Sequence, residues 1–275
     1  MAGKKENYSV LMSVYEKEKP DFLHQSMQSI YNQTIPTNDF VLICDGPLTE
    51  GLENVIKKMQ KKFGKRLRVV RLEKNVGLGN ALKVGIEECR NELIARMDSD
   101  DVSEKDRIEK QLKKIDKTGV DVIGSNIAEY DENMVNITGR RVVPTEHENI
   151  LKMMKTRNGM NHVTVVYKKS KVLDSGNYLD MPGFEDYYLW VRMMVNGCSF
   201  YNIQEDLVKV RCGDGMIGRR GGNNYIKNTK RFERTVYEMG FISYIQYLEI
   251  VVGRFFVSAM PNKIRSIVYK KALRK

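Results

Sequence analysis

Short continuous runs of apolar residues alternate with longer segments of helical periodicity along the first half of the chain. Continuous runs are typical of strands buried on both faces, whereas apolar residues three or four positions apart are typical of helices packed on a sheet. The pattern predicts strands at residues 8–15, 39–44, 67–72, 93–97 and 120–127, and helices at about 21–32, 52–63, 75–88 and 104–117. This alternation predicts an α/β, Rossmann-like fold with a mostly parallel sheet flanked by helices on both faces.

The second half of the chain is less regular. A strand is predicted at residues 162–167, a helix at 185–196 and a closing strand at 207–210. From residue 224 onward, helical spacing predicts two or three helices, with Pro261 before the last one. We therefore predict a main domain over residues 1–222 and a basic, amphipathic helical extension over residues 223–275.

The positive charge of the chain is concentrated in this extension. The 275 residues carry a formal net charge of +11, and residues 225–275 hold 11 Lys/Arg against 3 Asp/Glu, a net charge of +8. A basic end calls for an anionic partner, which is a membrane, a nucleic acid or a phosphorylated substrate. An amphipathic basic helix fits an anionic membrane surface, and the alternative is a helical layer packed on the domain with basic outer faces.

The four cysteines and the chain start bear on location. Cys44, Cys89, Cys198 and Cys212 form no C-x-x-C pair, which argues against a zinc site and a disulfide framework. The first residues are polar and lead directly into a strand, and no apolar run reaches about 18 residues. We therefore expect free thiols, no signal peptide, no membrane span and a cytoplasmic protein.

Polar residues follow each of the first four predicted strands. The carboxyl ends of parallel strands meet at one sheet edge, where open α/β sheets bind ligands. The strongest group is Asp98, Asp100 and Asp101, whose carboxylates suit Mg²⁺ or Mn²⁺. The alternative is a solvated loop that caps the next helix. The other polar residues near these strand ends are Ser13, Tyr15, Glu16, Asp45, Asn75 and Ser99.

Several other residues have both a chemical and a structural interpretation. Asp186 could act as a general base beside Glu185, or both acids could simply favour a helix start. The adjacent Arg219 and Arg220, followed by two glycines, suit a clamp on a pyrophosphate, or form a solvated pair. Further residues with this double interpretation are Arg96, a possible anion contact, the histidine His162 and the single tryptophan Trp190.

The order and spacing of these motifs over about residues 8–222 resemble the family 2 glycosyltransferases of GT-A fold. Within them, the chain is similar to bacterial polysaccharide-assembly enzymes such as those of amylovoran biosynthesis. The motifs that carry the resemblance are Ser-Val-Tyr, Asp-Gly-Pro, Asn-x-Gly-Leu-Gly-x-Ala-Leu, Ala-Arg-Met-Asp-Ser-Asp-Asp and Glu-Asp-Tyr-Tyr-Leu-Trp-x-Arg. The first strand departs from the commoner Pro-x-Tyr-Asn ending of that family, because it ends in Ser-Val-Tyr-Glu.

The resemblance implies a nucleotide-binding half at about residues 1–130 and an acceptor half at about 131–222. It implies that Asp100, with Asp98, ligates Mn²⁺ or Mg²⁺ on the diphosphate of a nucleotide-sugar, and that Asp45 accepts from the uracil imide. Asp186 is then the base, with Glu185 beside it. The residues expected to bind the nucleotide-sugar are Ser13, Tyr15, Glu16, Asp45, Asn75, Arg96, Asp98, Ser99, Arg219 and Arg220, and the acceptor-site candidates are His162 and Trp190.

The resemblance predicts inverting transfer of a hexose, most plausibly from a UDP-sugar, to a glycan or polyprenyl-pyrophosphate-linked acceptor at the inner face of the cell membrane. One alternative is a sugar nucleotidyltransferase, but the loop after the first strand lacks the glycine-rich sequence expected of that class. A second is a nucleic-acid-binding protein, but acids occupy the predicted crevice, so we expect no nucleic acid. A third is a catalytically inactive relative.

Overall fold

The computed structural model describes residues 7–212 and 223–259, and every structural statement below concerns these ranges. Its strands form one sheet in the order β3-β2-β1-β4-β8-β6-β9-β5, with β7 paired to β6. The strands are β1 (Tyr8–Val14), β2 (Asp39–Cys44), β3 (Leu67–Arg71), β4 (Leu93–Asp98), β5 (Val102–Ser103), β6 (Val122–Tyr130), β7 (Ile137–Arg141), β8 (Val166–Lys168) and β9 (Phe200–Arg211).

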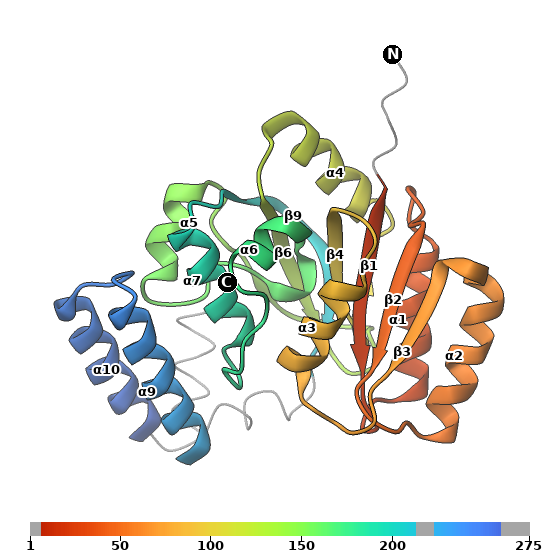
Figure 1. The fold of residues 1–275 in the computed structure, drawn as a ribbon, viewed down its shortest axis with the longest axis horizontal. Coiled ribbons are helices and arrows are strands. Elements are labelled where there is room, and N and C mark those ends of the chain that lie inside the picture. The colour runs from red at the N-terminus through yellow and green to blue at the C-terminus, as the bar shows by residue number, and fades with distance from the viewer. Residues whose placement is uncertain (1–6, 213–222, 260–275) are drawn as a thin grey trace.

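Helices cover both faces of this sheet (Figure 1). One apolar cluster joins the sheet to α1, α2 and α4, and the other joins it to α3, α5, α6 and α7. The predicted α/β sandwich is therefore confirmed. The helices are α1 (Pro20–Tyr31), α2 (Glu50–Phe63), α3 (Leu78–Glu88), α4 (Arg107–Thr118), α5 (His147–Met154), α6 (Lys169–Asp174), α7 (Glu185–Val195), α9 (Asn223–Glu238) and α10 (Tyr244–Ala259), with short 3₁₀ turns η1 (Gly64–Arg66) and η2 (His162–Thr164).

The sheet is parallel where the first four strands meet. β1 pairs in parallel with β2 and β4, and β2 pairs in parallel with β3, so the carboxyl ends of these strands lie at one edge. The short strand β8 runs antiparallel between β4 and β6 and separates this half from the parallel pair β6–β9. Polar residues at the first four strand ends are thus brought together, as the sequence predicted.

The predicted strand at residues 162–167 is wrong in its first half. Residues 162–164 form the turn η2, because the Thr164 backbone N–H and hydroxyl both donate to the carbonyl of Asn161, at 2.9 and 2.8 Å. The Thr164 hydroxyl also accepts from the Ser125 N–H at 2.9 Å. A side chain that bonds to nearby backbone in this way favours a turn over a strand. Extended structure begins only at Val166.

Several further boundaries differ from the prediction: α3 begins at Leu78, three residues later than predicted, and β6 extends to Tyr130. Helix α4 begins at Arg107, three residues later than predicted, because residues 102–103 pair with β9 as the short strand β5. The predicted closing strand at 207–210 is the end of the longer β9, which starts at Phe200. Strand β7 and helices α5 and α6 were not predicted. These elements all lie in the second half, where the apolar pattern is irregular.

Asp39 connects the amino-terminal ends of neighbouring strands, at the opposite end of these strands from the acid-bearing loops. Its carboxylate accepts from the Ser9 hydroxyl at 2.6 Å, from Arg68 Nε at 2.9 Å and from the Arg90 N–H at 3.0 Å. The Asp39 side chain is 1% exposed. Burial raises the pKa of Asp39, but the hydrogen bonds from Arg68, Ser9 and Arg90 outweigh it and hold the pKa below its ordinary value.

We expect Asp39→Ala to lower the free energy of unfolding by about 3 kcal/mol at neutral pH, because it leaves buried donors without their acceptor. The loss should shrink as the pH falls below about 4, since a carboxylate with a lowered folded pKa stabilises only while it is ionised. Urea unfolding at several pH values measures this. Asp116→Ala on the exposed side of α4 is the matched control, and an equal loss in both variants would contradict the prediction.

Helix α9 packs into the core of the main domain. Phe232 stacks on Phe184 with ring centroids 4.8 Å apart and lies 4.6 Å from the ring of Tyr187. Val236 and Ile242 belong to the same buried cluster. The core is therefore continuous across the boundary predicted at residue 222.

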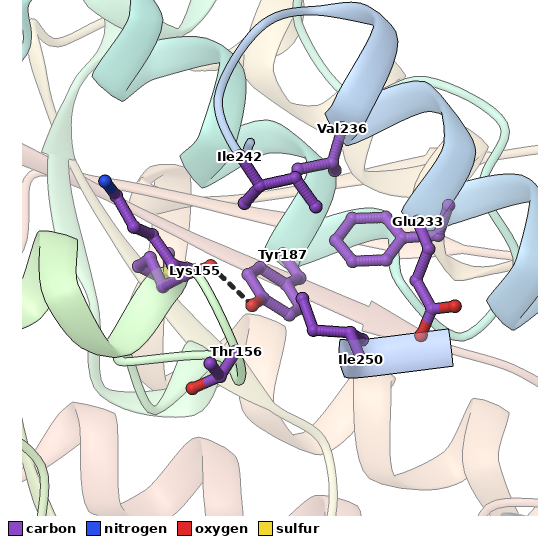
Figure 2. Close-up of a pocket in the computed structure, with 9 residues that line it drawn as sticks. Lys155, Thr156, Tyr187, Glu233, Val236, Ile242 and Ile250 are labelled. Carbon is purple, nitrogen blue, oxygen red and sulfur yellow. Dashed lines mark hydrogen bonds between the residues drawn. The ribbon is translucent and has the colours of Figure 1, made fainter. Parts of the chain in front are cut away.

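A small cavity marks this junction (Figure 2). Val236 of α9, Ile242 of the following connection and Ile250 of α10 surround the ring of Tyr187. The Tyr187 hydroxyl donates to the carbonyl of Met154 at 2.6 Å. The cavity has a volume of about 10 Å³. That volume holds about one water molecule, so the junction is a packing contact and not a ligand site.

Candidate active site

The acid cluster lies where β4 ends, beside the end of β1. In the register of these strands, Ser13 stands opposite Asp98. Asp98, Asp100 and Asp101 each offer a carboxylate oxygen, and these oxygens lie within 4.8 Å of one another. The predicted carboxylate group is therefore formed at the sheet edge where the first four strands end.

Arg96 holds Asp98 in place from within the protein. Its side chain is 2% exposed, and both terminal nitrogens donate to the two carboxylate oxygens of Asp98. Ile94, Arg96 and Asp98 occupy every second position of β4, so their side chains lie on the same face of the sheet. Ile94 belongs to the core on this face, which α3 and α7 cover. Arg96 was predicted to contact the nucleotide-sugar, but the structure places its guanidinium on Asp98.

Asp101 fastens the end of β9 to the cluster. It is 3% exposed, and its Oδ1 accepts from the backbone N–H of Arg211 at 2.8 Å. The Arg211 side chain donates from Nε to the Asp100 carbonyl at 3.0 Å. Burial, followed by the charges of Asp100 and Asp98, raises the pKa of Asp101 well above its ordinary value.

The charge of Asp100 is also poorly compensated. Burial, then the charges of Asp98 and Glu18, raise its pKa to about 7. Glu18, which the sequence did not single out, folds back from the loop after β1, and its carboxylate accepts from the Ser99 hydroxyl at 2.5 Å. An acid with a raised pKa among other acids is one that a cation would stabilise.

A divalent cation fits this donor set. Four carboxylates, those of Glu18, Asp98, Asp100 and Asp101, converge with two guanidinium groups, those of Arg96 and Arg211. A divalent cation would neutralise the negative charge gathered here, and carboxylate oxygens are the ligands that Mg²⁺ and Mn²⁺ prefer.

The Asp45 turn shapes the neighbouring wall. Its carboxylate accepts from the N–H groups of Val76 and Gly77 at 2.7 and 3.1 Å. Gly46 has a φ of +89°, and a Cβ there would lie 2.7 Å from the backbone nitrogen of Asn75. Asp45 is 4% exposed, so it fixes the loop before α3 in addition to its predicted nucleobase contact, which stays a prediction.

The end of β1 is open to solvent. Ser13 is half-buried, Tyr15 is 39% exposed and Glu16 is exposed. Tyr15 therefore offers an accessible ring near the sheet edge that carries the acids. The predicted nucleobase contacts of these three residues, like those of Asn75 and Ser99 with the nucleotide-sugar, stay predictions.

Helix α7 presents the second pair of acids. The Oδ2 of Asp186 accepts from Asn158 Nδ2 at 2.7 Å. Asn158 is itself fixed, because its Oδ1 accepts from the Met160 N–H at 3.0 Å and its carbonyl accepts from Arg141 at 2.6 Å. Burial raises the pKa of Asp186 and of Glu185, and nearby Arg96 opposes the rise in both.

The start of α3 lies close to the start of α7. A Cβ at Gly79 would lie 3.2 Å from the Cβ of Glu185. This approach brings the loop fixed by Asp45 next to the acids of α7. The helix that carries the candidate base thus lies beside the loop that follows the end of β3.

Two predicted acceptor contacts lie deeper than expected. Trp190 is fully buried and packs against Tyr167, Phe200 and His162, which corrects its prediction as an acceptor contact. His162 Nε2 is hydrogen-bonded to the Tyr178 hydroxyl at 2.8 Å, and burial lowers its pKa well below the ordinary value, so the ring is neutral. Arg219 and Arg220 lie outside the described residues.

The chain matches known glycosyltransferases over nearly its whole length. The profile of glycosyl transferase family 2 matches residues 9–174. The chain is 35% identical to the UDP-Gal:alpha-D-GlcNAc-diphosphoundecaprenol beta-1,3-galactosyltransferase of Escherichia coli, over 98% of this chain and 97% of the relative. It is 36% identical to the amylovoran biosynthesis glycosyltransferase AmsE of Erwinia amylovora, over 96% and 98%.

Solved structures share the fold. S. aureus TarS 1-349 in complex with UDP-GlcNAc superposes with a TM-score of 0.68 at 17% identity, covering 89% of this chain and 70% of TarS. The mannosyltransferase PcManGT of Pyrobaculum calidifontis, in complex with GDP-Man and Mn²⁺, gives a TM-score of 0.66 at 11% identity, covering 98% and 76%. With its GT-A fold and this match in sequence, the chain belongs to the family 2 glycosyltransferases.

Proposed function

We propose that the protein transfers a hexose from a UDP-sugar to a lipid-linked saccharide during assembly of a bacterial surface polysaccharide, with a divalent cation and with inversion at the anomeric carbon. The observation that carries the proposal is the acid cluster, whose three carboxylates lie within 4.8 Å of one another and whose partner Arg96 lies near Asp186. The two relatives support the proposed donor and acceptor classes, because one is named for a UDP-Gal donor and a diphosphoundecaprenol acceptor and the other for amylovoran biosynthesis.

Each part of the site has a task in this reaction. Asp100 and Asp98 would hold the cation, which when bound neutralises charge on the departing diphosphate. Asp186 removes the proton from the acceptor hydroxyl as that oxygen attacks the anomeric carbon. Attack from the face opposite the leaving group inverts the configuration. Arg96 keeps the Asp98 carboxylate oriented throughout.

The acceptor also bears on where the protein works. In the described part of the chain, no helix has the length and apolar character needed to cross a membrane. A polyprenyl-pyrophosphate-linked acceptor is confined to the bilayer, so we place the enzyme at the inner face of the cell membrane as a peripheral protein. The basic final helices support this location.

A donor panel tests the proposal. We would measure binding of UDP-galactose, UDP-GlcNAc, UDP-glucose and GDP-mannose with and without Mn²⁺, and then transfer to a short-chain pyrophosphate-linked GlcNAc. Mn²⁺-dependent binding of one UDP-sugar, followed by transfer with an inverted linkage, is the expected result. Binding of no donor, or formation of nucleotide-sugar from a sugar phosphate and UTP, would overturn the proposal in favour of another class.

Asn158 gives the proposed base a specific pH signature. Its hydrogen bond opposes the rise that burial imposes on the pKa of Asp186. We expect Asn158→Leu to raise that pKa further and to move the acid limb of the kcat–pH profile upward by about half to one pH unit. Much of the lost kcat should return at higher pH, because Asp186 works only when deprotonated.

The matched control for this pH shift is Asn54→Leu on the exposed side of α2, which should leave the profile unchanged. A fall in kcat that is the same at every pH would mean that Asn158 merely supports the fold.

A further inference from the structure

Helices α9 and α10 form an antiparallel pair at the end of the molecule opposite α2 (Figure 1). Their inner sides are anchored, because Phe232, Val236 and Ile242 are buried in the main core. The outer side of the pair is called here the α9–α10 face. It consists of a basic row on α9 (Lys227, Lys230, Arg231, Arg234) and an apolar row on α10 (Tyr244, Ile245, Leu248, Val252).

The apolar row is largely exposed to solvent. Ile245 is 69% exposed, Val252 52% and Leu248 42%, and the three residues recur at helical spacing on one side of α10. Single exposed apolar residues are common on proteins, but a continuous row marks a surface that contacts something.

The basic row carries charge that the protein does not fully neutralise. Arg231 pairs with Asp180 and Arg234 pairs with Glu238, whereas Lys227 and Lys230 form no ion pair within the described residues. All four cations fall at spacings of three or four residues, so they share one side of α9. This side therefore attracts anions.

A groove runs between the basic row and the side of α10 that lies next to the apolar row. Lys230, Arg231 and Arg234 line one wall, and Tyr247 and Val251 of α10 line the other. A groove with cations on one wall and apolar and aromatic groups on the other suits an amphiphile with an anionic head, which is the chemistry of a phospholipid. A nucleic acid would use the cations but leave the apolar row unexplained.

We propose that the α9–α10 face docks on an anionic phospholipid bilayer, with the apolar row at the acyl boundary and the basic row on lipid phosphates. The sequence after α10 continues the same charge, because residues 260–275 contain six Lys/Arg and no Asp/Glu. The inference rests on the proposed function in one respect: a bilayer is also where a lipid-linked acceptor lies.

The position of α9 relates this surface to the active site. Asn228 donates to the carbonyl of Pro182 at 3.2 Å, and Arg231 pairs with Asp180. Both contacts are made to the loop that leads into Glu185 and Asp186. When the α9–α10 face is docked on a membrane, the loop that precedes the candidate base Asp186 therefore lies next to the membrane contact.

Co-sedimentation of the full chain with vesicles tests the docking. Vesicles of neutral phosphatidylcholine are compared with vesicles that contain about a quarter phosphatidylglycerol, at low and high salt. We expect binding to the anionic vesicles that weakens with salt. Lys227→Gln/Lys230→Gln should reduce the partition coefficient by about thirtyfold, and Ile245→Ser/Leu248→Ser by about tenfold.

The matched control is Lys57→Gln/Lys61→Gln on the exposed side of α2, which removes the same charge elsewhere and should change binding less than about twofold. Unchanged melting temperatures show that the variants fold. Equal losses in the control and the α9 variant would overturn the proposal, as would absence of binding to anionic vesicles. Conversion of a dimer to a monomer by Ile245→Ser/Leu248→Ser, with vesicle binding retained, would identify the face as a contact between copies and also overturn it.

Transfer to a water-soluble, short-chain acceptor separates the two proposals. The face variants should retain this activity at the wild-type level, because none of the changed residues lies in the active site. Soluble transfer without vesicle binding would refute the docking alone. Vesicle binding without any donor binding or transfer would refute the proposed function alone.

Discussion

Asp100→Asn is expected to lower kcat/KM for glycosyl transfer by about a thousandfold and to abolish the Mn²⁺ dependence of donor binding. The neutral amide removes one of the two charges that would hold the cation, and loss of such charge stabilisation on a leaving diphosphate costs about 4 kcal/mol. Kinetics and calorimetric donor titration, each with and without Mn²⁺, measure both effects. Asp116→Asn on the exposed side of α4 is the matched control.

The same substitution should make the metal-free protein more stable. The pKa of Asp100 is raised to about 7 by burial and by Asp98 and Glu18, so its ionised form opposes folding. The gain of Asp100→Asn should be absent below about pH 4, grow up to about pH 7 and then level off at about 4 kcal/mol. A variant that is inactive and also less stable at neutral pH would indicate a structural role for Asp100 instead.

Asp186→Asn should reduce kcat by about 10²–10⁴-fold and leave the affinity for the donor nearly unchanged. The amide keeps the shape of the side chain but cannot take a proton from the acceptor hydroxyl. Asp186 lies on α7 and is hydrogen-bonded to Asn158, whereas the residues that would hold the nucleotide lie at the strand ends. Single-turnover transfer together with donor titration separates the two quantities.

Asp180→Asn provides the comparison for Asp186, because Asp180 lies six residues earlier in the same segment and its side chain is 66% exposed. Its transfer rate should stay within about twofold of the wild type. Loss of donor affinity in Asp186→Asn, with kcat retained, would remove Asp186 from the role of base.

The parts of the fold that the sequence predicted are those in which burial dictates the pattern. β2 and α2 are surrounded by core on one or both sides, so apolar spacing alone marked them. β8 is only three residues long and follows a turn held by the Thr164 side chain, so its pattern is decided by local hydrogen bonds. Periodicity cannot reveal such bonds.

The site could be predicted where its acidic residues lie close together in the sequence. Three acids after an apolar strand predicted the cluster, but Glu18 reaches it only because its loop folds back onto Ser99. Asn158 gave no signal, since a polar residue in a loop has no spacing to distinguish it. Trp190 was misplaced because it shares a motif with Glu185 and Asp186, whereas its side chain is fully buried on the inward side of α7, one helical turn beyond Asp186.

Phe232 stacks on Phe184 and also contacts the ring of Tyr187, and these contacts limit which chimeras of this chain will keep a packed core. A chimera that joined the first 222 residues of one relative to the last helices of another would place an unfamiliar side chain against both rings. The mismatch would fall at the start of α7, directly beside the candidate base. An active chimera therefore has to take residues 180–190 and α9 from the same parent protein.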